Sequence, residues 1–294
     1  MIVVSGASGQ LGRRTVQMLL ELVDAAEVIA VSRTPDKAAD LGVATRHADF
    51  DDPDGLVAAF DGAQRLLLIS TDAVRTHGYR ARQHTNAIRA ASRAGVEYVV
   101  YTSLTGADRP GHPIGAPMAD HAVTERALAE SGLAYTVLRN NMYTELLLYA
   151  APAAVASGVL ASNQGAGATG YVTREDCAAT AATLLVHGGH SERLLDVTGP
   201  AAVTDDQVAA MLSEVTGRRV RHQSLTDEQV VAGAIGHGTP PLIAQMTAGF
   251  GRAAREGLFD VVTDVVERVS GRQPITVADF LAAHRPLLVA ATGA

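Results

Sequence analysis

Short apolar runs alternate with amphipathic stretches along the first two-thirds of the 294-residue chain. The runs are rich in β-branched residues and predict strands at residues 2–5, 28–32, 45–48, 66–69, 96–101 and 135–138. The stretches between them have helical spacing and cover residues 10–23, 35–41, 53–59, 81–94 and 119–130. Strands that are apolar throughout and alternate with helices predict an α/β fold of the Rossmann type, a doubly wound parallel sheet with helices on both faces.

The pattern changes after Asn140, where helical stretches predominate. We expect helices at residues 143–156 and 173–187, a loop at 161–170, and at 194–198 a strand that returns to the sheet. From Thr204 onward we expect almost only helices. The chain then divides into a sheet domain, residues 1–140 with 171–200, and a smaller, mostly helical lobe for substrate or partner, residues 141–170 with 201–294.

A glycine-rich segment joins the first expected strand to the first expected helix. It consists of Gly6, Ala7, Ser8, Gly9, Gln10, Leu11 and Gly12. In such a position the first glycine permits a tight turn, the second lets backbone N–H groups approach a pyrophosphate, and the third lets the helix pack on the sheet. The helix N-terminus adds partial positive charge. We therefore predict a dinucleotide site here in preference to an ordinary strand-to-helix turn.

The end of the second expected strand indicates which dinucleotide binds. NAD-dependent proteins commonly place Asp or Glu there to hold the ribose hydroxyls. Residues 31–35 contain no carboxylate, and Arg33 offers a planar fork of donors that suits a phosphate. This favours NADPH, with Arg33 at its 2′-phosphate, over an arginine that is only solvated. Asp49, after the third strand, either accepts from the adenine amino group or caps the next turn.

Composition narrows the class of protein. Apolar residues make up 47% of the chain, and the net charge of −7 without a basic block argues against a nucleic-acid partner. Cys177 is the only cysteine, so neither an intrachain disulfide nor a cysteine metal cluster is expected, and we predict no metal site. We expect no signal peptide and no membrane span. These features predict a cytoplasmic protein and leave its oligomeric state open, a homodimer included.

The proton-transfer pair of many short-chain dehydrogenases, Tyr-x-x-x-Lys, is absent. Lys37 is the only lysine and follows no tyrosine at that spacing. Near the corresponding position stand His121 and Glu125, one helical turn apart. His121 is a candidate proton donor. An exposed His–Glu pair is the slightly favoured interpretation, because such pairs are common on helix surfaces.

Two further clusters offer polar groups. Asn140, Asn141 and Tyr143 directly follow the sixth expected strand, at the sheet edge where α/β proteins bind ligands. Their uncharged donors and acceptors suit a carboxamide or a carbonyl. Arg174 and Asp176 begin a helix, and an ion pair that stabilises this helix is favoured there over contact with a cofactor.

A series of segments in order along nearly the whole chain carries a family resemblance. They are the glycine segment, Leu67-Leu68-Ile69-Ser70, Tyr101-Thr102-Ser103, His121 with Thr124-Glu125, Tyr135-Thr136, Leu138-Arg139-Asn140, Tyr143 and Val172-Thr173-Arg174. Together they resemble the NmrA-like branch of the atypical short-chain dehydrogenases, in particular its quinone- and triphenylmethane-reducing members. The resemblance implies a flavin-free enzyme that uses NADPH to reduce quinones. It also implies a site lined by residues 6–11, Arg33, Ile69, Ser70, Thr71, residues 140–145 and residues 171–176, which shifts Arg174 towards the pocket.

Quinone reduction is compatible with the missing Tyr–Lys pair. A hydroquinone anion is far less basic than the alkoxide formed from a ketone, so a dedicated acid is less needed. The main contributions to the rate are then the positioning of the nicotinamide against the acceptor and hydrogen bonds from uncharged donors. The catalytic candidates are Asn140, Tyr143 and His121. In related plant reductases a lysine acts at the position of His121, so proton transfer by His121 stays an open question.

Two other functions stay open at this point. An NADP-sensing regulator would bind the cofactor and a protein partner without turnover, and residues 204–283 would then form the docking surface. A sugar-nucleotide epimerase is disfavoured, because that chemistry needs the tyrosine base.

Overall fold

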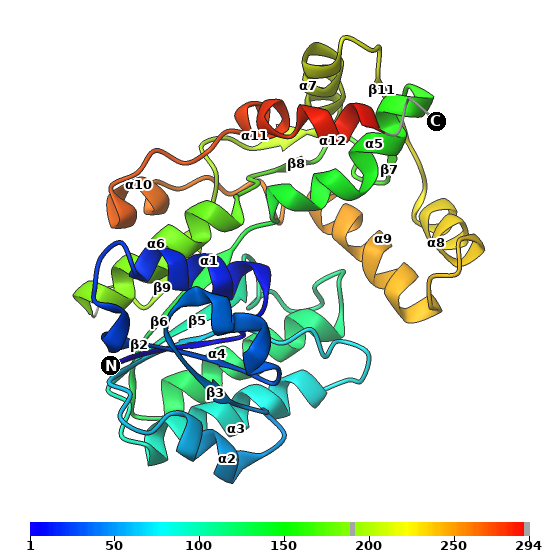
Figure 1. Ribbon diagram of the computed structural model, residues 1–294. Coiled ribbons are helices and arrows are strands. Elements are labelled where there is room, and N and C mark those ends of the chain that lie inside the picture. The colour runs from blue at the N-terminus through cyan, green and yellow to red at the C-terminus, as the bar shows by residue number, and fades with distance from the viewer. Residues whose placement is uncertain (189–191, 291–294) are drawn as a thin grey trace.

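A seven-stranded parallel sheet forms the centre of the computed structural model, which describes residues 1–188 and 192–290 (Figure 1). The strands lie in the order β3-β2-β1-β4-β5-β6-β9, and every neighbouring pair is parallel. Their bounds are β1 Ile2–Ser5, β2 Val28–Ser32, β3 Ala44–His47, β4 Arg65–Leu68, β5 Tyr98–Leu104, β6 Ala134–Asn140 and β9 Leu194–Val197. The doubly wound sheet is confirmed, and β9 returns to it beside β6 as predicted. The order changes direction between β1 and β4, the point at which α/β sheets bind ligands.

Helices cover both faces of the sheet (Figure 1). On one face lie α1 Gln10–Leu19, α6 Arg174–His187 and α10 Val265–Ser270, and on the other α2 Pro53–Ala59, α3 Tyr79–Arg93 and α4 Ala116–Glu130. Alternate strand residues supply the two cores, so Val4 packs towards α1 and α6 while Val3 packs towards α2 and α3. Three short 3₁₀ helices, η1 Ala25–Glu27, η2 Pro35–Leu41 and η3 Thr144–Leu146, lie in the connections.

A smaller lobe packs against the loops at the carboxyl edge of the sheet (Figure 1). It has its own core, to which Leu160, Leu212 and Phe280 belong. Its elements are α5 Leu147–Ser157, β7 Val159–Ser162, β8 Ala168–Thr169, β10 Val203–Thr204, α7 Asp205–Thr216, β11 Arg221–Ser224, α8 Asp227–Gly236, α9 Pro241–Arg255, α11 Val277–Ala283 and α12 Arg285–Ala290. The lobe and the sheet meet where Phe259 packs with Met118 near the start of α4. This contact brings α9 over the sheet edge.

The structure corrects three local expectations. Residues 35–41 form a 3₁₀ helix, which is tighter than the α-helix that the pattern suggests. The segment 161–170, expected to be a loop, contains the end of β7 and all of β8. The region after Thr204 contains β11 among its helices, paired in parallel with β7. The four residues of β11 are polar and mostly exposed, so they lack the hydrophobic alternation by which a strand is predicted.

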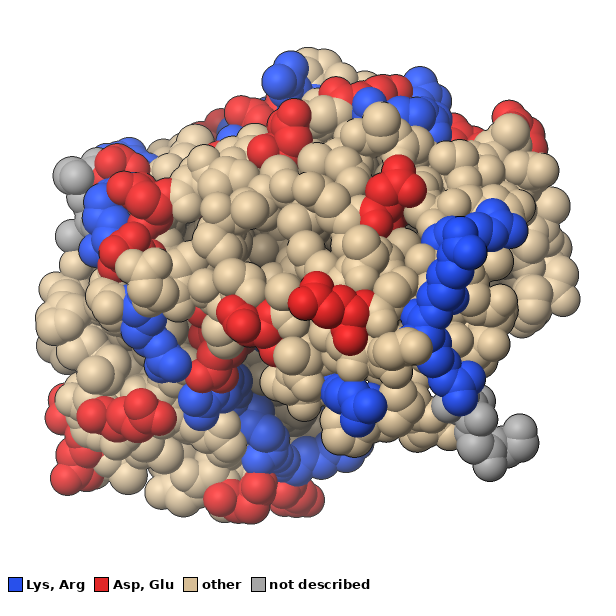
Figure 2. Space-filling model, turned by 90° about the horizontal axis from the view of Figure 1, so that it is seen from above, with Lys and Arg blue, Asp and Glu red and all other residues tan. Residues whose placement is uncertain are grey.

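Charged side chains of both signs are interspersed on the face shown in Figure 2, around a broad uncharged area. The net charge of −7 is therefore not gathered in one patch on this face. Within residues 1–188 and 192–290, no helix is long and apolar enough to cross a membrane. The same residues contain no group of three or more His, Cys, Asp or Glu side chains that could hold a metal ion.

Candidate functional site

The glycine segment turns tightly between β1 and α1. Gly6 has a φ of +63°, a conformation that favours glycine, and its carbonyl oxygen accepts from the Gly9 N–H at 2.9 Å. A Cβ atom on Gly12 would lie 2.4 Å from that carbonyl oxygen, so α1 rests directly on the turn. Among the described residues, no side chain caps the start of α1. The first backbone N–H groups of the helix therefore suit an anionic ligand.

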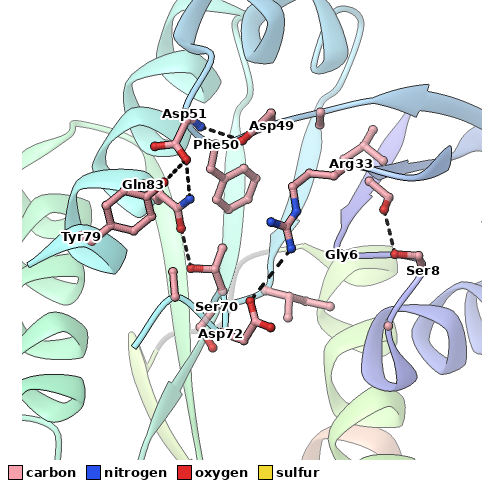
Figure 3. Close-up of a pocket in the computed structure, with 17 residues that line it drawn as sticks. Gly6, Ser8, Arg33, Asp49, Phe50, Asp51, Ser70, Asp72, Tyr79 and Gln83 are labelled. Atoms are coloured by element: carbon pink, nitrogen blue, oxygen red, sulfur yellow. Dashed lines mark hydrogen bonds and ion pairs between the residues drawn. The ribbon is translucent and has the colours of Figure 1, made fainter. Parts of the chain in front are cut away.

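A cavity of about 330 Å³ lies beside this turn, at the carboxyl ends of β1, β2, β3 and β4 (Figure 3). Seven of the predicted cofactor-binding residues line it: Gly6, Ser8, Gly9, Arg33, Ile69, Ser70 and Thr71. Ser8 and Ser32 are joined across the turn by a hydrogen bond of 2.7 Å between their hydroxyls. Four other predicted residues, Ala7, Gln10, Leu11 and Gly12, do not line the cavity. The side chains of Ala7 and Leu11 belong to the core, so only their backbone atoms can face a ligand.

Arg33 extends across the cavity towards Asp72 (Figure 3). Its guanidinium lies 4.0 Å from the Asp72 carboxylate, and the two side chains are 68% and 95% exposed. An ion pair of this length and exposure is weak. Arg33 therefore keeps most of its donors for a ligand phosphate. Asp49 lines the same cavity and also caps its turn, because its Oδ1 accepts from the Asp51 N–H at 3.0 Å.

The cavity includes a polar cluster that sequence reasoning missed. The Tyr79 hydroxyl and the Gln83 amide both donate to the Asp51 carboxylate, and the Thr71 hydroxyl donates to Gln83 at 2.8 Å. These bonds, that of Tyr79 first, hold the pKa of Asp51 below its usual value. An ionised carboxylate here suits a ligand amino group. Tyr79 and Gln83 stand on α3, and only the folding of α3 against the sheet brings them to Asp51.

A second cavity, of about 210 Å³, lies at the carboxyl ends of β5 and β6. Ser70 lines both cavities, so they meet at the end of β4. The other polar lining residues are Ser103, His121, Asn140, Asn141 and Tyr143, and the apolar ones are Leu104, Met142, Leu146 and Phe250. All three catalytic candidates thus come together here. Phe250 was not predicted: it arrives from α9, in the smaller lobe, and no local sequence signal points to it.

Asn140 lines this cavity and carries a buried acceptor atom. Its amide nitrogen donates to the Tyr143 hydroxyl at 3.1 Å, while its Oδ1 is buried and accepts from no group in residues 1–188 and 192–290. A buried acceptor without a donor is costly, and a ligand amide N–H would satisfy it. Burial raises the pKa of Tyr143, which keeps its hydroxyl protonated and able to donate. Asn141, by contrast, uses its side chain within the fold, on the Phe259 carbonyl and the Met142 N–H.

The favoured interpretation of His121 as half of an exposed His–Glu pair is wrong. His121 is 5% exposed, and its Nδ1 lies 2.7 Å from the Tyr101 hydroxyl. Glu125 instead accepts from the Ser103 hydroxyl at 2.6 Å and from Arg139 at 2.6 and 3.1 Å. This face of α4 is covered by β5 and β6. Arg139 of β6 is therefore the ionic partner of Glu125, in place of His121 one helical turn away.

The expected Arg174–Asp176 pair is also wrong. Arg174 lies 3.4 Å from the Glu145 carboxylate and stacks over the Tyr143 ring, with its guanidinium 4.4 Å from the ring centroid. Asp176 accepts from the Thr173 hydroxyl and from the Ile275 N–H. Arg174, predicted to bind the cofactor, lines neither of the two cavities and meets the second only through its contact with Tyr143.

The fold and the glycine turn define a Rossmann-type dinucleotide-binding protein, in which a second, partly apolar cavity adjoins the first. The comparison with protein families agrees with this class, since a model described as NAD(P)H-binding matches residues 6–188. The chain belongs to this NAD(P)H-binding family.

Relatives extend the match to the whole chain. Quinone oxidoreductase 2 of Escherichia coli is 39% identical over 284 residues, which cover 95% of this chain and 96% of the relative. The crystal structure of that NADPH-dependent quinone oxidoreductase in complex with NADPH superposes with a TM-score of 0.90 at 37% identity, covering 97% of this chain and 99% of the other. Triphenylmethane reductase of Citrobacter sp., solved with NADP(H), gives a TM-score of 0.90 at 32% identity, with 97% and 100% covered. The resemblance inferred from the motifs is confirmed.

Proposed function

We propose that the protein is a flavin-free, NADPH-dependent reductase that transfers a hydride to a quinone or a similar conjugated acceptor. The observation that carries this proposal is the buried, unpaired Oδ1 of Asn140, beside the Tyr143 hydroxyl, in a cavity that adjoins the glycine turn. The relatives named above are NADPH-dependent quinone and triphenylmethane reductases, which supports the same chemistry.

The first cavity fits NADPH. Gly6 and Gly9 leave room for a pyrophosphate against the N-terminus of α1, and Arg33 is available to the 2′-phosphate. The Asp51 carboxylate, which Tyr79 and Gln83 orient, can accept from the adenine amino group. In the second cavity, the free Oδ1 of Asn140 can accept from the carboxamide of the nicotinamide. When bound, NADPH supplies the hydride.

The second cavity fits a flat, conjugated acceptor. Leu104, Met142, Leu146 and Phe250 offer apolar contacts to a ring. The protonated Tyr143 hydroxyl can donate to an acceptor oxygen and stabilise the negative charge that develops there. A hydroquinone anion is a weak base, so hydrogen bonding can stabilise it and solvent can supply the final proton.

The test is a turnover assay. Purified protein is mixed with NADPH and a panel of quinones and triarylmethane dyes, and nicotinamide absorbance is followed with product analysis. We expect NADPH oxidation that depends on the acceptor and needs no added flavin. If the protein binds NADPH tightly but oxidises it with none of these acceptors, the proposal fails and a non-catalytic NADP sensor becomes the better explanation.

We also propose a cytoplasmic location, because the only cysteine, Cys177, is buried and the chain cannot use an intrachain disulfide.

A homodimer is proposed as the oligomeric state of the protein. Light scattering on the purified protein measures the molar mass directly: one chain weighs 30.5 kDa, so a mass near that value would refute the dimer.

A further inference from the structure

A buried chain of hydrogen-bonding side chains runs between the two cavities. Tyr101 of β5 stands between His84 of α3 and His121 of α4, and all three side chains are buried. The Tyr101 hydroxyl lies 2.7 Å from Nδ1 of His121 and 3.3 Å from Nδ1 of His84. At the far end, the backbone N–H of Thr71 meets Nε2 of His84 at 3.0 Å. Thr71 lines the first cavity and His121 lines the second.

The backbone N–H of Thr71 determines the tautomer of His84. An amide N–H can only donate, so Nε2 of His84 must be the bare, accepting nitrogen. The neutral ring then carries its proton on Nδ1. That N–H lies 3.0 Å from the Thr124 hydroxyl oxygen, whose own proton is donated to the Asp120 carbonyl at 2.7 Å.

The tautomer of His84 in turn determines that of His121. Because Nδ1 of His84 carries a proton, it cannot accept from Tyr101. The Thr124 hydroxyl, which also meets Tyr101, already accepts from His84 and donates to Asp120, so we assign the Tyr101 proton to Nδ1 of His121, the shortest contact at 2.7 Å. Nδ1 of His121 is therefore an acceptor, and the ring proton sits on Nε2. Among the described residues Nε2 has no partner, and His121 lines the second cavity.

Burial, and after it a nearby positive charge, keeps both histidines neutral. Arg80 is 5% exposed, donates to the Pro117 carbonyl and lies 3.8 Å from the Asp120 carboxylate. Desolvation first, and then Arg80, lowers the pKa of His84 to about 3, and the same two causes, with His84 added, hold the pKa of His121 far below its usual value. The other ionisable groups around the chain are Asp120 and Glu125 of α4 and Tyr101 itself, whose pKa burial raises.

We propose that Tyr101 and His84 are positioning residues that hold His121 as a neutral donor, with its Nε2–H directed at the acceptor oxygen in the second cavity, and that the same chain holds Thr71 beside the first cavity. This inference rests on the proposed function. It assigns His121 a hydrogen bond to the substrate and not the transfer of a proton. This role of His121 suits acceptors whose reduced anion is a weak base, such as quinones, because a hydrogen bond then stabilises the anion without the His121 proton being transferred.

The tautomer can be measured without any substrate. Long-range ¹H–¹⁵N spectra of the apoprotein distinguish protonated from bare ring nitrogens, and the spectrum of His121→Gln identifies the His121 signals by difference. We expect Nε2 protonated and Nδ1 bare throughout the range from about pH 6 to 8, since the ring lies far from its titration there. A proton on Nδ1, or an imidazolium in this range, overturns the proposal whether or not the protein reduces quinones.

Two matched variants test the donor in turnover. The amide nitrogen of His121→Gln can replace Nε2, whereas the shorter side chain of His121→Asn reaches only the Tyr101 side. We expect His121→Gln to keep kcat within about twofold of wild type and His121→Asn to lose about fivefold, the effect of one hydrogen bond, with the KM for NADPH unchanged. Equal losses in the two variants, or a wild-type kcat that falls with rising pH as a charged acid is lost, contradict the proposal.

Variants of Tyr101 and His84 test the positioning roles. Tyr101→Phe removes the hydroxyl, so the Nδ1–H tautomer of His121 should appear in the spectrum and kcat should fall, with an unchanged Kd for NADPH. His84→Gln keeps an acceptor for Thr71, whereas His84→Asn does not, so only His84→Asn should weaken NADPH binding. A His121 tautomer unaffected by Tyr101→Phe, in a protein that is still folded by circular dichroism, rules out the positioning role of Tyr101.

Discussion

Arg33 is the residue on which the proposed preference for NADPH over NADH depends most directly. Its side chain is 68% exposed, and within the part of the chain that the structure describes its guanidinium forms an ion pair only with the Asp72 carboxylate, 4.0 Å away. A charge-assisted hydrogen bond contributes about 1.5–3 kcal/mol, and exposure places Arg33 at the lower end because solvent screens the charges. At about 1.4 kcal/mol for each factor of ten, Arg33→Ala should weaken NADPH binding about tenfold. NADH has no 2′-phosphate, so its affinity should not change.

Asp72→Asn is the matched variant with the opposite expected sign. In the wild type, the Asp72 carboxylate competes for Arg33 and repels a phosphate. Its removal should therefore tighten NADPH binding by about two- to threefold, which is the effect of one exposed ion pair. Calorimetry with NADPH and NADH on wild type and both variants measures these changes, and both should shrink as salt concentration rises. Equal wild-type affinities for the two cofactors, or an unchanged ratio in Arg33→Ala, would refute the assignment of Arg33.

Three further predictions concern other parts of the site. Gly9→Asp should abolish NADPH binding but leave the fold largely intact, because a side chain and a negative charge would meet the pyrophosphate; near-normal affinity by calorimetry would contradict this. Asn140→Ala and Tyr143→Phe should each lower kcat roughly 10²- to 10³-fold with a simple benzoquinone at saturating NADPH, whereas His121→Ala should lower it less than about tenfold; the reverse ranking would indicate acid-dependent chemistry. Burial lowers the pKa of His84 to about 3, so the free energy of unfolding should be highest above about pH 6.5 and should fall as the unfolded chain takes up a proton below that pH. His84→Gln should reduce that slope by about 1.4 kcal/mol per pH unit between about pH 5.5 and 4.5 in urea titrations, and an unchanged slope would show that His84 is not buried neutral.

The elements that line the first cavity were predictable because their signals are local. Gly6 needs a positive φ whatever surrounds it, and a β-branched run such as that of β2 favours a strand by its own side-chain geometry. The position of Arg33 directly after that strand follows from the same pattern. Failures occurred where the local signal was ambiguous: His121 and Glu125 have the spacing of a surface pair, and Arg174 and Asp176 that of a helix-start pair.

Those ambiguities were resolved by partners that are distant in the sequence. Glu125 is neutralised by Arg139 of β6, and Arg174 by Glu145, across spacings that no helical period relates. A buried charge takes the nearest partner in three dimensions, because leaving it unpaired in a medium of low polarity is costly. The chain therefore specifies which residues carry charge, while the packing of α4 against β5 and β6 selects which charges meet.

The sequence alone determined the α/β class, the glycine turn, the place of Arg33 and the candidate set Asn140, Tyr143 and His121, since all of these depend on backbone preference and on which strand end a residue follows. Tertiary structure alone decided that Phe250 closes the second cavity, that the Asn140 Oδ1 is left unpaired, and that Tyr101 joins His121 to His84. Hydrogen bonds depend on distances and angles that many packing contacts set jointly. A pattern of residue types along the chain does not contain those distances.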